Sequence, residues 1–529
     1  MPRPRTAAAT ALLLVPIVAG GFLLQEVPVR QSARLFDQVF SIVTDRFVDS
    51  LSAAGAYERA ARGLVEQLDD PYSELLAPTA REEFGRQTNG RYGGIGMLLE
   101  EIQGTVGVAR VFPHTPAEEG GVQEGDRIVA IGDSSTRDWG LTRVSDALRG
   151  QPGSRVNVTF LRPGVTEPIR SRFVRRIVRV PAVPYSMMVD NGVGYIPLQT
   201  FNENAADEVR EAIEQLRRSG AKGLVLDLRG NGGGIVDQSL AVTGLFLREG
   251  QEIVRVRGRD ARDEIARTEG PPIEASLPLV VLTDESAASA SEIVAGALQD
   301  HDRGLVVGET TFGKGLVQSV FPLDGGYALK LTTAKWYTPS GRSIHKDRAP
   351  QRPGAARVSA RDTVSDSTAR AARPKYRSDA GRVVYGGGGI IPDVTVASDT
   401  ITTIEREYLR VAAPKGQTIT GVIHAYALEL KGRVRPDFTV TDAMMAELKR
   451  RLAAAGAPID PRHAEGATRF YQRELEHQIA RAAFGDAGAK RRELPYDRQL
   501  TRATALLRGA SSQEALFAAA EVSTRTSRK

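Results

Sequence analysis

The sequence contains no cysteine and only six histidines among its 529 residues. Without cysteine the chain can form no disulfide, no thiolate nucleophile, no zinc–thiolate site and no cysteine-ligated iron–sulfur cluster. The histidines show no close metal-ligand spacing such as HExxH, so we expect no metal site and no cofactor. The basic excess is thin, with 70 Lys+Arg against 64 Asp+Glu. Spread over 57 kDa, that excess is too small to argue for nucleic-acid binding without a clustered patch, so we expect no nucleic-acid partner.

Long apolar runs are equally scarce, and residues 7–24 form the one run that is long enough to enter a bilayer. This run carries no charge and follows Arg3 and Arg5, a pattern typical of an export signal. Its 18 residues would also suffice for a transmembrane anchor, and no A-x-A cleavage site decides between the two. We therefore expect an exported protein that begins with a signal sequence or a membrane anchor.

The patterning of the remaining chain predicts several domains. Three patterns follow one another along the sequence. The first has apolar residues at helical spacing, the second has short β-branched runs between glycines, and the third has apolar strands that alternate with helices. The last pattern predicts an α/β core with mostly parallel strands. The predicted parts are a signal sequence or anchor (1–25), an N-terminal helical segment (26–90), a small β-rich domain (91–178), an α/β core (179–345 and 385–396), a flexible insertion (346–384) and a helical C-terminal extension (397–529).

A glycine-rich loop, DLRGNGGG at 227–234, directly follows the apolar strand GLVLDL. Four glycines in eight residues let backbone N–H groups approach a ligand closely, so the loop suits an anion or an oxyanion. A plain tight turn would explain the same glycines, and the loop alone does not decide between these interpretations. For Asp227 we expect a loop-stabilising role rather than a catalytic one.

A second strand–turn–helix pattern is DESAASASEIVAGALQD at 284–300, after LPLVVLT. This layout lifts a serine hydroxyl out of the fold and frees the next backbone N–H to serve as an oxyanion donor. Ser289 is the candidate nucleophile, and Ala290 is the candidate donor. The alternative is that the serines at 286–291 only cap a helix.

A serine nucleophile needs a base, and His301 lies one helix away at the wrong end. Lys314 in TFGKGLVQ is the better candidate, provided that burial lowers its pKa from about 10.4 to about 7–8. Gln318, four positions on, can fix the amine without adding charge. The run GETTFGK at 308–314 also fits the start of a phosphate-binding P-loop, but Gly315 stands where that motif needs Ser or Thr.

Five motifs together resemble, in order, the carboxyl-terminal processing (tail-specific) proteases of the S41 serine peptidase family: LDDPYS, DLRGNGGG, SASEIVAGALQD, GKGLVQ and WYTPSGRSI. The resemblance implies a crotonase-like α/β peptidase core within a multidomain α/β protein. It also implies that Ser289 is the nucleophile, Lys314 the base and Gln318 the residue that orients the base. Backbone N–H groups of Gly232 or Gly233, together with Ala290, would form the oxyanion hole.

The family also places a PDZ domain before the core, and residues 91–178 look like one. In RYGGIGM, the residues Gly94, Ile95, Gly96 and Met97 match the loop that binds a peptide's terminal carboxylate. The resemblance thus implies a serine endopeptidase that processes or degrades exported proteins with apolar C-terminal tails, in the periplasm or cell envelope. A homo-oligomer, an adaptor partner, and activation rather than mere tethering by the PDZ domain stay open. The competing hypothesis is a binding module with a silent peptidase.

Overall fold

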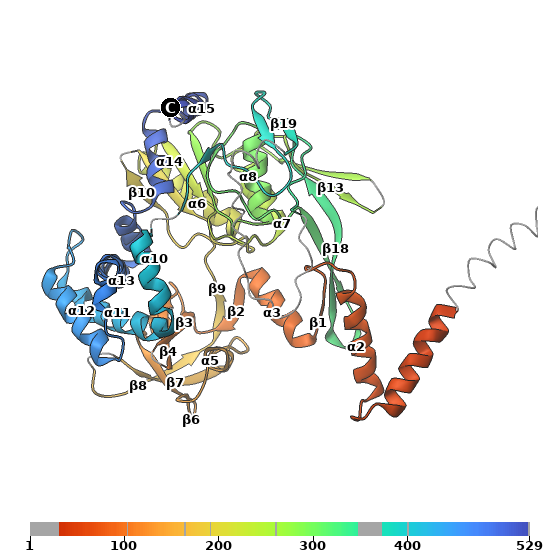
Figure 1. Ribbon diagram of the computed structural model, residues 1–529, viewed down its shortest axis with the longest axis horizontal. Helices are drawn as coiled ribbons and strands as arrows, with labels where there is room; N and C mark the ends of the chain where they lie inside the picture. The colour runs from red at the N-terminus through yellow and green to blue at the C-terminus, as the bar shows by residue number, and fades with distance from the viewer. Residues whose placement is uncertain are drawn as a thin grey trace, which may run out of the picture. The chain divides into compact units, whose positions relative to one another are not determined.

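The computed structural model describes residues 31–102, 104–162, 165–190, 192–259, 262–346, 373–398 and 401–526 (Figure 1). These residues belong to two compact units. The smaller unit holds residues 31–78 and Gln318–Thr332, and the larger unit holds the rest. The predicted signal or anchor lies outside the described residues. Within them, no helix combines the length and the apolar character that a membrane crossing requires.

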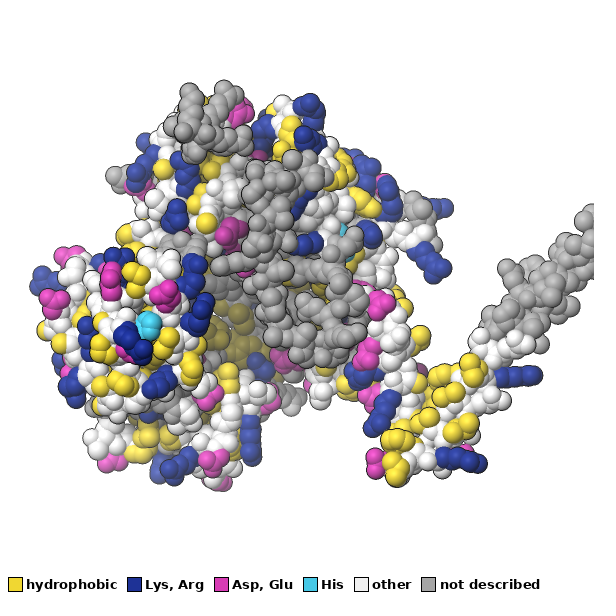
Figure 2. Space-filling view, in the orientation of Figure 1, with side chains coloured by type: hydrophobic (Ala, Val, Ile, Leu, Met, Phe, Trp, Pro, Cys, Tyr) yellow, Lys and Arg dark blue, Asp and Glu magenta, His cyan; other side chains and the backbone are white. Residues whose placement is uncertain are grey.

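The smaller unit begins with two helices, at 31–46 and at α2 (Ala53–Glu66), which agrees with the helical spacing. Ser52 caps α2 by accepting a hydrogen bond from the Gly55 N–H. Strand β1 (Glu74–Leu76) pairs antiparallel with the start of β18 (Ala328–Tyr337), and β17 (Leu316–Pro322) pairs with β18 as well. The helix at 31–46 exposes an apolar stripe that Figure 2 shows along its length: Leu35, Phe36, Val39 and Ile42.

The larger unit begins at Thr79, the second residue of α3 (Pro78–Asn89), and continues into the β-rich domain. Its sheet has the strand order β3-β4-β5-β7-β8, with β6 beside β5, and β2 pairs with β9. Val108, Val144 and Phe160 lie in one buried core between this sheet and α5. Strand β3 stands at the end of the sheet order. The elements are β2 (Arg91–Gly94), β3 (Met97–Ile102), β4 (Thr105–Val111), α4 (Pro116–Glu119), β5 (Arg127–Ile131), β6 (Ser134–Ser135), α5 (Leu141–Leu148), β7 (Arg155–Leu161), β8 (Ile169–Val174) and β9 (Arg176–Arg179).

The α/β core is a sheet with the order β10-β11-β12-β15-β16-β21, in which all neighbours after the antiparallel β10–β11 pair run parallel. Strands β11, β12, β15 and β16 are buried at every residue, as parallel strands covered on both faces must be. The strands are β10 (Met187–Asp190), β11 (Val193–Pro197), β12 (Gly223–Asp227), β15 (Leu279–Thr283), β16 (Leu305–Gly308) and β21 (Val394–Thr395).

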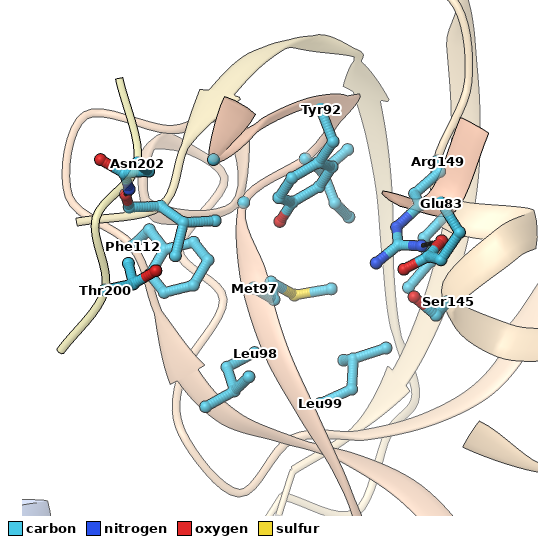
Figure 3. A pocket seen from close by; sticks show the side chains of 15 residues that line it. Glu83, Tyr92, Met97, Leu98, Leu99, Phe112, Ser145, Arg149, Thr200 and Asn202 are labelled. Carbon is cyan, nitrogen blue, oxygen red and sulfur yellow. Dashed lines mark hydrogen bonds and ion pairs between the residues drawn. The ribbon is translucent and has the colours of Figure 1, made fainter. Parts of the chain in front are cut away.

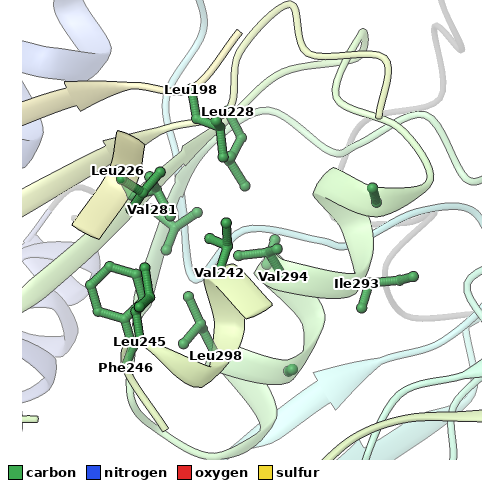
Figure 4. Close-up of a cluster of buried hydrophobic side chains, with 14 of the residues drawn as sticks. Leu198, Leu226, Leu228, Val242, Leu245, Phe246, Val281, Ile293, Val294 and Leu298 are labelled. Atoms are coloured by element: carbon green, nitrogen blue, oxygen red, sulfur yellow. The ribbon is translucent and has the colours of Figure 1, made fainter. Parts of the chain in front are cut away.

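Alternate residues of each core strand face opposite layers of helices. On one face Leu226 and Val281 pack against α6 (Ala205–Arg218), α7 (Val236–Gly244) and α8 (Ala290–Asp300), and Figure 4 shows the centre of this cluster. On the other face Val225 and Val280 pack against α14 (Arg498–Arg508) and α15 (Gln513–Thr526). The predicted C-terminal extension therefore supplies the second helical layer of the core.

The rest of the extension is a helical bundle of α10 (Thr403–Ala412), α11 (Gly416–Leu430), α12 (Asp442–Ala454) and α13 (Ala464–Glu493). These helices bury their own core, in which Tyr408 and Tyr471 share a hydrogen bond between their hydroxyls. The bundle also contacts the β-rich domain, because Arg110 of β4 pairs with Asp486 of α13 at 2.8 Å. The extension thus contacts both the β-rich domain and the core.

Two further features complete the larger unit. Strands β13 (Glu252–Gly258) and β14 (Asp263–Arg267) pair with each other, and β13 also pairs with the end of β18. Strands β19 (Lys375–Arg377) and β20 (Val383–Tyr385) form a hairpin. The prediction that 346–384 lacks structure is therefore wrong for 375–384, where Arg382 pairs with Asp302 and Asp393 and anchors the hairpin to the core. Residues 347–372 are not among those described.

Candidate active site

Ser289 stands at the junction between β15 and α8, in a backbone conformation that is rare for a residue with a side chain. Its φ is +55° and its ψ is −110°. Such conformations cost of order 1–3 kcal/mol and persist only where the surroundings enforce them. Here Asp284 fixes the turn by accepting hydrogen bonds from the N–H groups of Ser286 and Ala287, at 3.0 and 2.9 Å. The turn leaves Ser289 half-buried between fully buried alanines, as a presented nucleophile would be.

The glycine loop packs directly on this turn. Gly233 has φ +99°, and a Cβ added there would lie 2.8 Å from the Ala288 carbonyl oxygen and 3.0 Å from the Ser289 Cβ. No side chain fits at such distances, so glycine is required for the close approach. The two loops predicted from separate motifs therefore lie side by side.

Asn231, which the sequence analysis did not single out, fastens the glycine loop in place. Its side chain is fully buried and donates to the Leu198 carbonyl at 2.8 Å. Its own carbonyl accepts hydrogen bonds from the Ala288 N–H at 3.0 Å and from the Ser291 hydroxyl at 2.9 Å. Asn231 is thus a hydrogen-bonded link between the loop and the serine turn.

The backbone donors next to Ser289 are not equivalent. The Gly233 N–H already donates to Asn231 Oδ1 at 2.9 Å. Across the ranges that the structure covers, the N–H groups of Gly232 and Ala290 have no hydrogen-bond partner. Ala290 is the first residue of α8, where the N–H groups have no intrahelical acceptor and the helix dipole favours negative charge. Gly232 and Ala290 are therefore the donors available to an oxyanion.

Glu292, three residues after Ser289, joins the serine turn to the lysine loop and was also missed. It is fully buried. Oε2 accepts the N–H groups of Ser289 and Lys314, both at 2.8 Å. Oε1 accepts the Thr311 hydroxyl at 2.6 Å and the Gly313 N–H at 2.7 Å. Burial raises the pKa of the Glu292 carboxyl above its ordinary value, although the four donors favour the carboxylate.

Lys314 itself lies in the loop between β16 and β17, two residues before β17 begins. The spacing of four residues between Lys314 and Gln318 would place both on one side of a continuous strand, but Lys314 precedes β17, so this expectation from strand alternation is wrong. The backbone carbonyl of Lys314 accepts a hydrogen bond from the Trp336 indole at 3.1 Å, so both ends of its backbone unit are held. Gln318 belongs to the smaller unit, where its amide donates to the Tyr72 carbonyl at 2.7 Å.

The other predicted residues surround a pocket of about 340 Å³ in the β-rich domain (Figure 3). Ile95, Gly96 and Met97 line it, whereas Gly94 is not among its lining residues. Figure 3 shows Leu98 and Leu99 on one side of Met97 and the Tyr92 ring on another. The remaining lining residues are Glu83, Gly90, Phe112, Ser145, Leu148, Arg149, Val180, Thr200 and Asn202. The cavity is mostly apolar, as a site for an apolar peptide end would be.

One wall of this pocket is shared with the glycine loop. Thr200 and Asn202 line the pocket, and Phe201 between them faces the loop. The Phe201 N–H donates to the Gly233 carbonyl at 3.1 Å, and the Phe201 carbonyl accepts the Ile235 N–H at 2.7 Å. An occupant of the pocket would therefore touch a segment that is hydrogen-bonded to the glycine loop.

No group of side chains suited to hold a metal ion occurs in the described part of the chain. His301 is fixed by Asp379 and by the Glu252 carbonyl, both at 2.7 Å, so it is held in a structural contact far along α8 from Ser289. Asp227 accepts from Arg229 and from the Tyr195 hydroxyl, which agrees with a loop-stabilising role.

Comparison with known proteins gives consistent matches. Residues 192–351 match peptidase family S41, and residues 107–162 match a PDZ domain. The chain is 37% identical over 321 residues to a carboxy-terminal-processing protease of Bartonella bacilliformis, covering 60% of this chain and 73% of that protein. It is 36% identical over 287 residues to the carboxy-terminal processing protease CtpA of Bacillus subtilis, covering 54% of this chain but only 61% of that protein's length. The solved structure of a photosystem II D1 C-terminal processing protease is 28% identical and aligns with 70% of this chain and 88% of its own, with a TM-score of 0.39.

Proposed function

Because the chain belongs to the carboxy-terminal processing proteases of peptidase family S41, we propose that it is a serine endopeptidase with a Ser289–Lys314 dyad. It would process or degrade exported proteins and recognise their C-terminal tails through its PDZ domain. The predicted family and the predicted combination of an S41 core with a PDZ domain are confirmed. The observation that carries the catalytic proposal is the strained turn at Ser289, which lies against the glycine loop and shares the Glu292 carboxylate with the backbone of Lys314.

In the proposed reaction, the Ser289 Oγ attacks the carbonyl carbon of the scissile peptide bond while the neutral Lys314 Nζ accepts the hydroxyl proton. The carbonyl oxygen becomes an oxyanion and accepts the N–H groups of Gly232 and Ala290. When the tetrahedral intermediate collapses, the C–N bond breaks and the lysine ammonium returns its proton to the leaving amine. A water molecule then repeats the sequence on the acyl-enzyme ester and releases Ser289. The role of Gln318 in orienting the lysine amine stays a prediction from the family resemblance.

The tail-recognition proposal is supported by the edge strand β3 and the pocket beside it. A peptide can add as a further strand beside β3, which ends the order of the described sheet, and its last apolar side chain can enter the pocket around Met97. Backbone N–H groups near Ile95 and Gly96 would receive the terminal carboxylate. The shared wall at Phe201 gives such a ligand a route to the glycine loop, so a ligand that prefers one loop arrangement would also shift activity.

The site of action proposed from residues 7–24 is outside the cytoplasm, in the periplasm or cell envelope. This proposal rests on the sequence of those residues. Fractionation of cells that express the full chain with a C-terminal tag would test it, since retention of the whole protein in the cytoplasmic fraction would contradict export.

The catalytic proposal is tested with an unfolded polypeptide that ends in a free valine. Cleavage should vanish in Ser289→Ala and persist in Ser286→Ala, an exposed serine of the same turn. It should vanish in Lys314→Arg, because a guanidinium cannot act as a base, and persist in Lys335→Arg on β18. Gln318→Ala should slow cleavage less severely. Full activity of Lys314→Arg would disprove the dyad, and a folded wild type that binds the substrate without cleaving it would favour the binding-module alternative.

Tail recognition has its own test, in which the substrate's terminus is left free, amidated, or extended by two aspartates. Recognition through the pocket predicts a preference for the free apolar end, and Met97→Asp should erase that preference by placing a charge in the cavity. A short apolar-ended peptide added in trans should accelerate cleavage of another substrate only if the PDZ domain activates as well as tethers. Equal cleavage of the three substrates would remove the pocket from the account of specificity.

A further inference from the structure

A buried ion-pair network joins the glycine loop to the C-terminal extension. Arg229, two residues after the end of β12, donates to both carboxylate oxygens of Asp497 at 2.9 and 2.8 Å. It also donates to Asp227 at 2.6 Å and to Gln499 at 3.0 Å. The three charged side chains are only 17%, 7% and 10% exposed for Arg229, Asp227 and Asp497, so water screens these contacts little.

Asp497 is the hub of this network. Its carboxylate accepts the Lys490 ammonium at 2.8 Å and also caps α14 by accepting the Leu500 N–H at 2.9 Å. Burial alone would raise the pKa of the Asp497 carboxyl, but Arg229 and Lys490 hold it well below its ordinary value. At neutral pH the group is therefore a carboxylate, and each bond it accepts from a cation is charge-assisted.

Arg229, which Asp497 binds, directly precedes the first glycine of the glycine loop. The Arg229 N–H donates to Asp227 Oδ1 at 3.0 Å, and the next N–H, that of Gly230, donates to Asp284 at 3.0 Å. Asp284 in turn shapes the Ser289 turn. Gly232 lies three residues after Arg229, and two of those three residues, Gly230 and Gly232, are glycines with a permissive backbone. The bonds of Arg229 and Gly230 therefore restrain this stretch together with those of Asn231.

We infer that Asp497 is a positioning residue, which acts through Arg229 to hold the glycine loop where its donors face Ser289. The catalytic consequence rests on the proposed function, whereas the structural consequence does not. Asp497 lies outside the residues that match the S41 family and the PDZ domain. The C-terminal extension is thus part of the apparatus that sets the geometry of the reaction.

The test uses the full chain with Asp497→Asn, which keeps an excellent helix cap and removes the charge. Glu429→Gln is the matched control, because it breaks a two-bond ion pair with Arg451, at 2.7 and 2.8 Å, elsewhere in the extension. Hydrogen exchange of the amides at 228–234 should become roughly tenfold faster in Asp497→Asn and stay unchanged in Glu429→Gln. Exchange in β15 should not change in either variant, which separates loop release from general unfolding. Lys490→Gln should give a smaller effect in the same direction.

The kinetic arm uses a short peptide substrate. Asp497→Asn should lower kcat roughly tenfold and leave KM within about twofold, because the loop acts on the oxyanion rather than on substrate binding. In a variant that already carries Arg229→Gln, adding Asp497→Asn should lower kcat no further, because the two side chains act on the same loop. The midpoint of the pH–rate profile, which reports the pKa of the catalytic base, should not change.

The outcomes separate the inference from the proposed function. Loop exchange within twofold of wild type in Asp497→Asn, or additive losses in the double variant, would overturn the inference. Faster loop exchange with an unchanged kcat would overturn its catalytic part. If wild-type cleavage did not depend on Ser289, the proposed function would fail, while the exchange measurement would still decide whether Asp497 holds the loop.

Discussion

Glu292 offers the sharpest single perturbation of the site, because one carboxylate serves four donors from two loops. Glu292→Gln keeps the shape of the side chain but replaces one acceptor oxygen with an NH₂ group. If the NH₂ takes the place of Oε2, it faces the N–H groups of Ser289 and Lys314, and both lose their acceptor. If it takes the place of Oε1, the Thr311 hydroxyl can turn to accept from it, and the Gly313 N–H and the Thr311 O–H then lose Oε1 as their acceptor. The second orientation is therefore preferred.

The expected loss of stability in Glu292→Gln follows from that orientation. One buried N–H without an acceptor costs about 1–3 kcal/mol, and the remaining bonds lose their charge assistance. Because removing the charge also removes its desolvation cost, which is the factor that raises the pKa of Glu292, part of the loss is offset. We expect a net destabilisation of about 1–3 kcal/mol. The effect on kcat should be larger, about a hundredfold, because a displacement of about 1 Å between nucleophile and base is enough for that loss.

Urea unfolding and steady-state cleavage of a short peptide measure the two effects. Glu264→Gln, an exposed glutamate of β14, is the control and should change neither. Glu292→Asp should not rescue the activity, because a shorter side chain cannot reach both loops. A Glu292→Gln enzyme whose kcat stayed within threefold of wild type, while its stability fell as expected, would show that the carboxylate holds the fold but not the dyad.

Three further predictions concern the loop, the base and the network. Gly233→Ala should destabilise the protein by at least about 2 kcal/mol, from its positive φ and its contact with the Ala288 carbonyl, whereas Gly232→Ala has open space around its Cβ and should alter the unfolding free energy by less than about 1 kcal/mol. The cleavage rate should rise with pH through the neutral to mildly alkaline range as Lys314 loses its proton, and a flat profile from about pH 5 to 9 with chemistry limiting would contradict a lysine base. Because the folded-state pKa of Asp497 is lowered, its stabilisation is complete above the unfolded value of 3.8 and is lost as pH falls through the folded pKa, so the gap in urea midpoint between wild type and Asp497→Asn should be constant from pH 7 to about 4 and narrow below that. If the difference in urea midpoint already narrowed between pH 7 and 5, the titration of a group other than Asp497 would be responsible for it.

The parts of the fold that the sequence predicts are those with a strong local signal. The apolar runs GLVLDL and LPLVVLT predict buried strands, and the glycine and serine turns after them predict loops at one edge of a parallel sheet. The structure places Gly233 against Ser289 at that edge. Residues 375–385 show the limit of this reasoning, because the hairpin there is short and polar and is anchored by Arg382 to Asp302 and Asp393, which no periodicity reveals.

The parts that the sequence does not predict depend on contacts between distant residues. Glu292 looks like an ordinary residue of the first helical turn, where a glutamate is common, and only the fold brings Thr311 and Gly313 to its carboxylate. Asn231 looks like a turn residue, yet its role depends on Leu198 and Ser291. Buried polar residues of this kind have no periodic pattern, since their partners lie on other elements.

The position of α14 and α15 explains why the C-terminal extension cannot be treated as an appendage. Alternate residues of the core strands, such as Val225 and Val280, would face water without these helices. A parallel sheet with one bare apolar face does not occur as a stable layer, so the core is incomplete at residue 396 and is completed only by residues 498–526. Asp497, the cap of α14, thus enters the fold together with the helix that closes the sheet, and its pairing with Arg229 links closure of the sheet to the placement of the glycine loop.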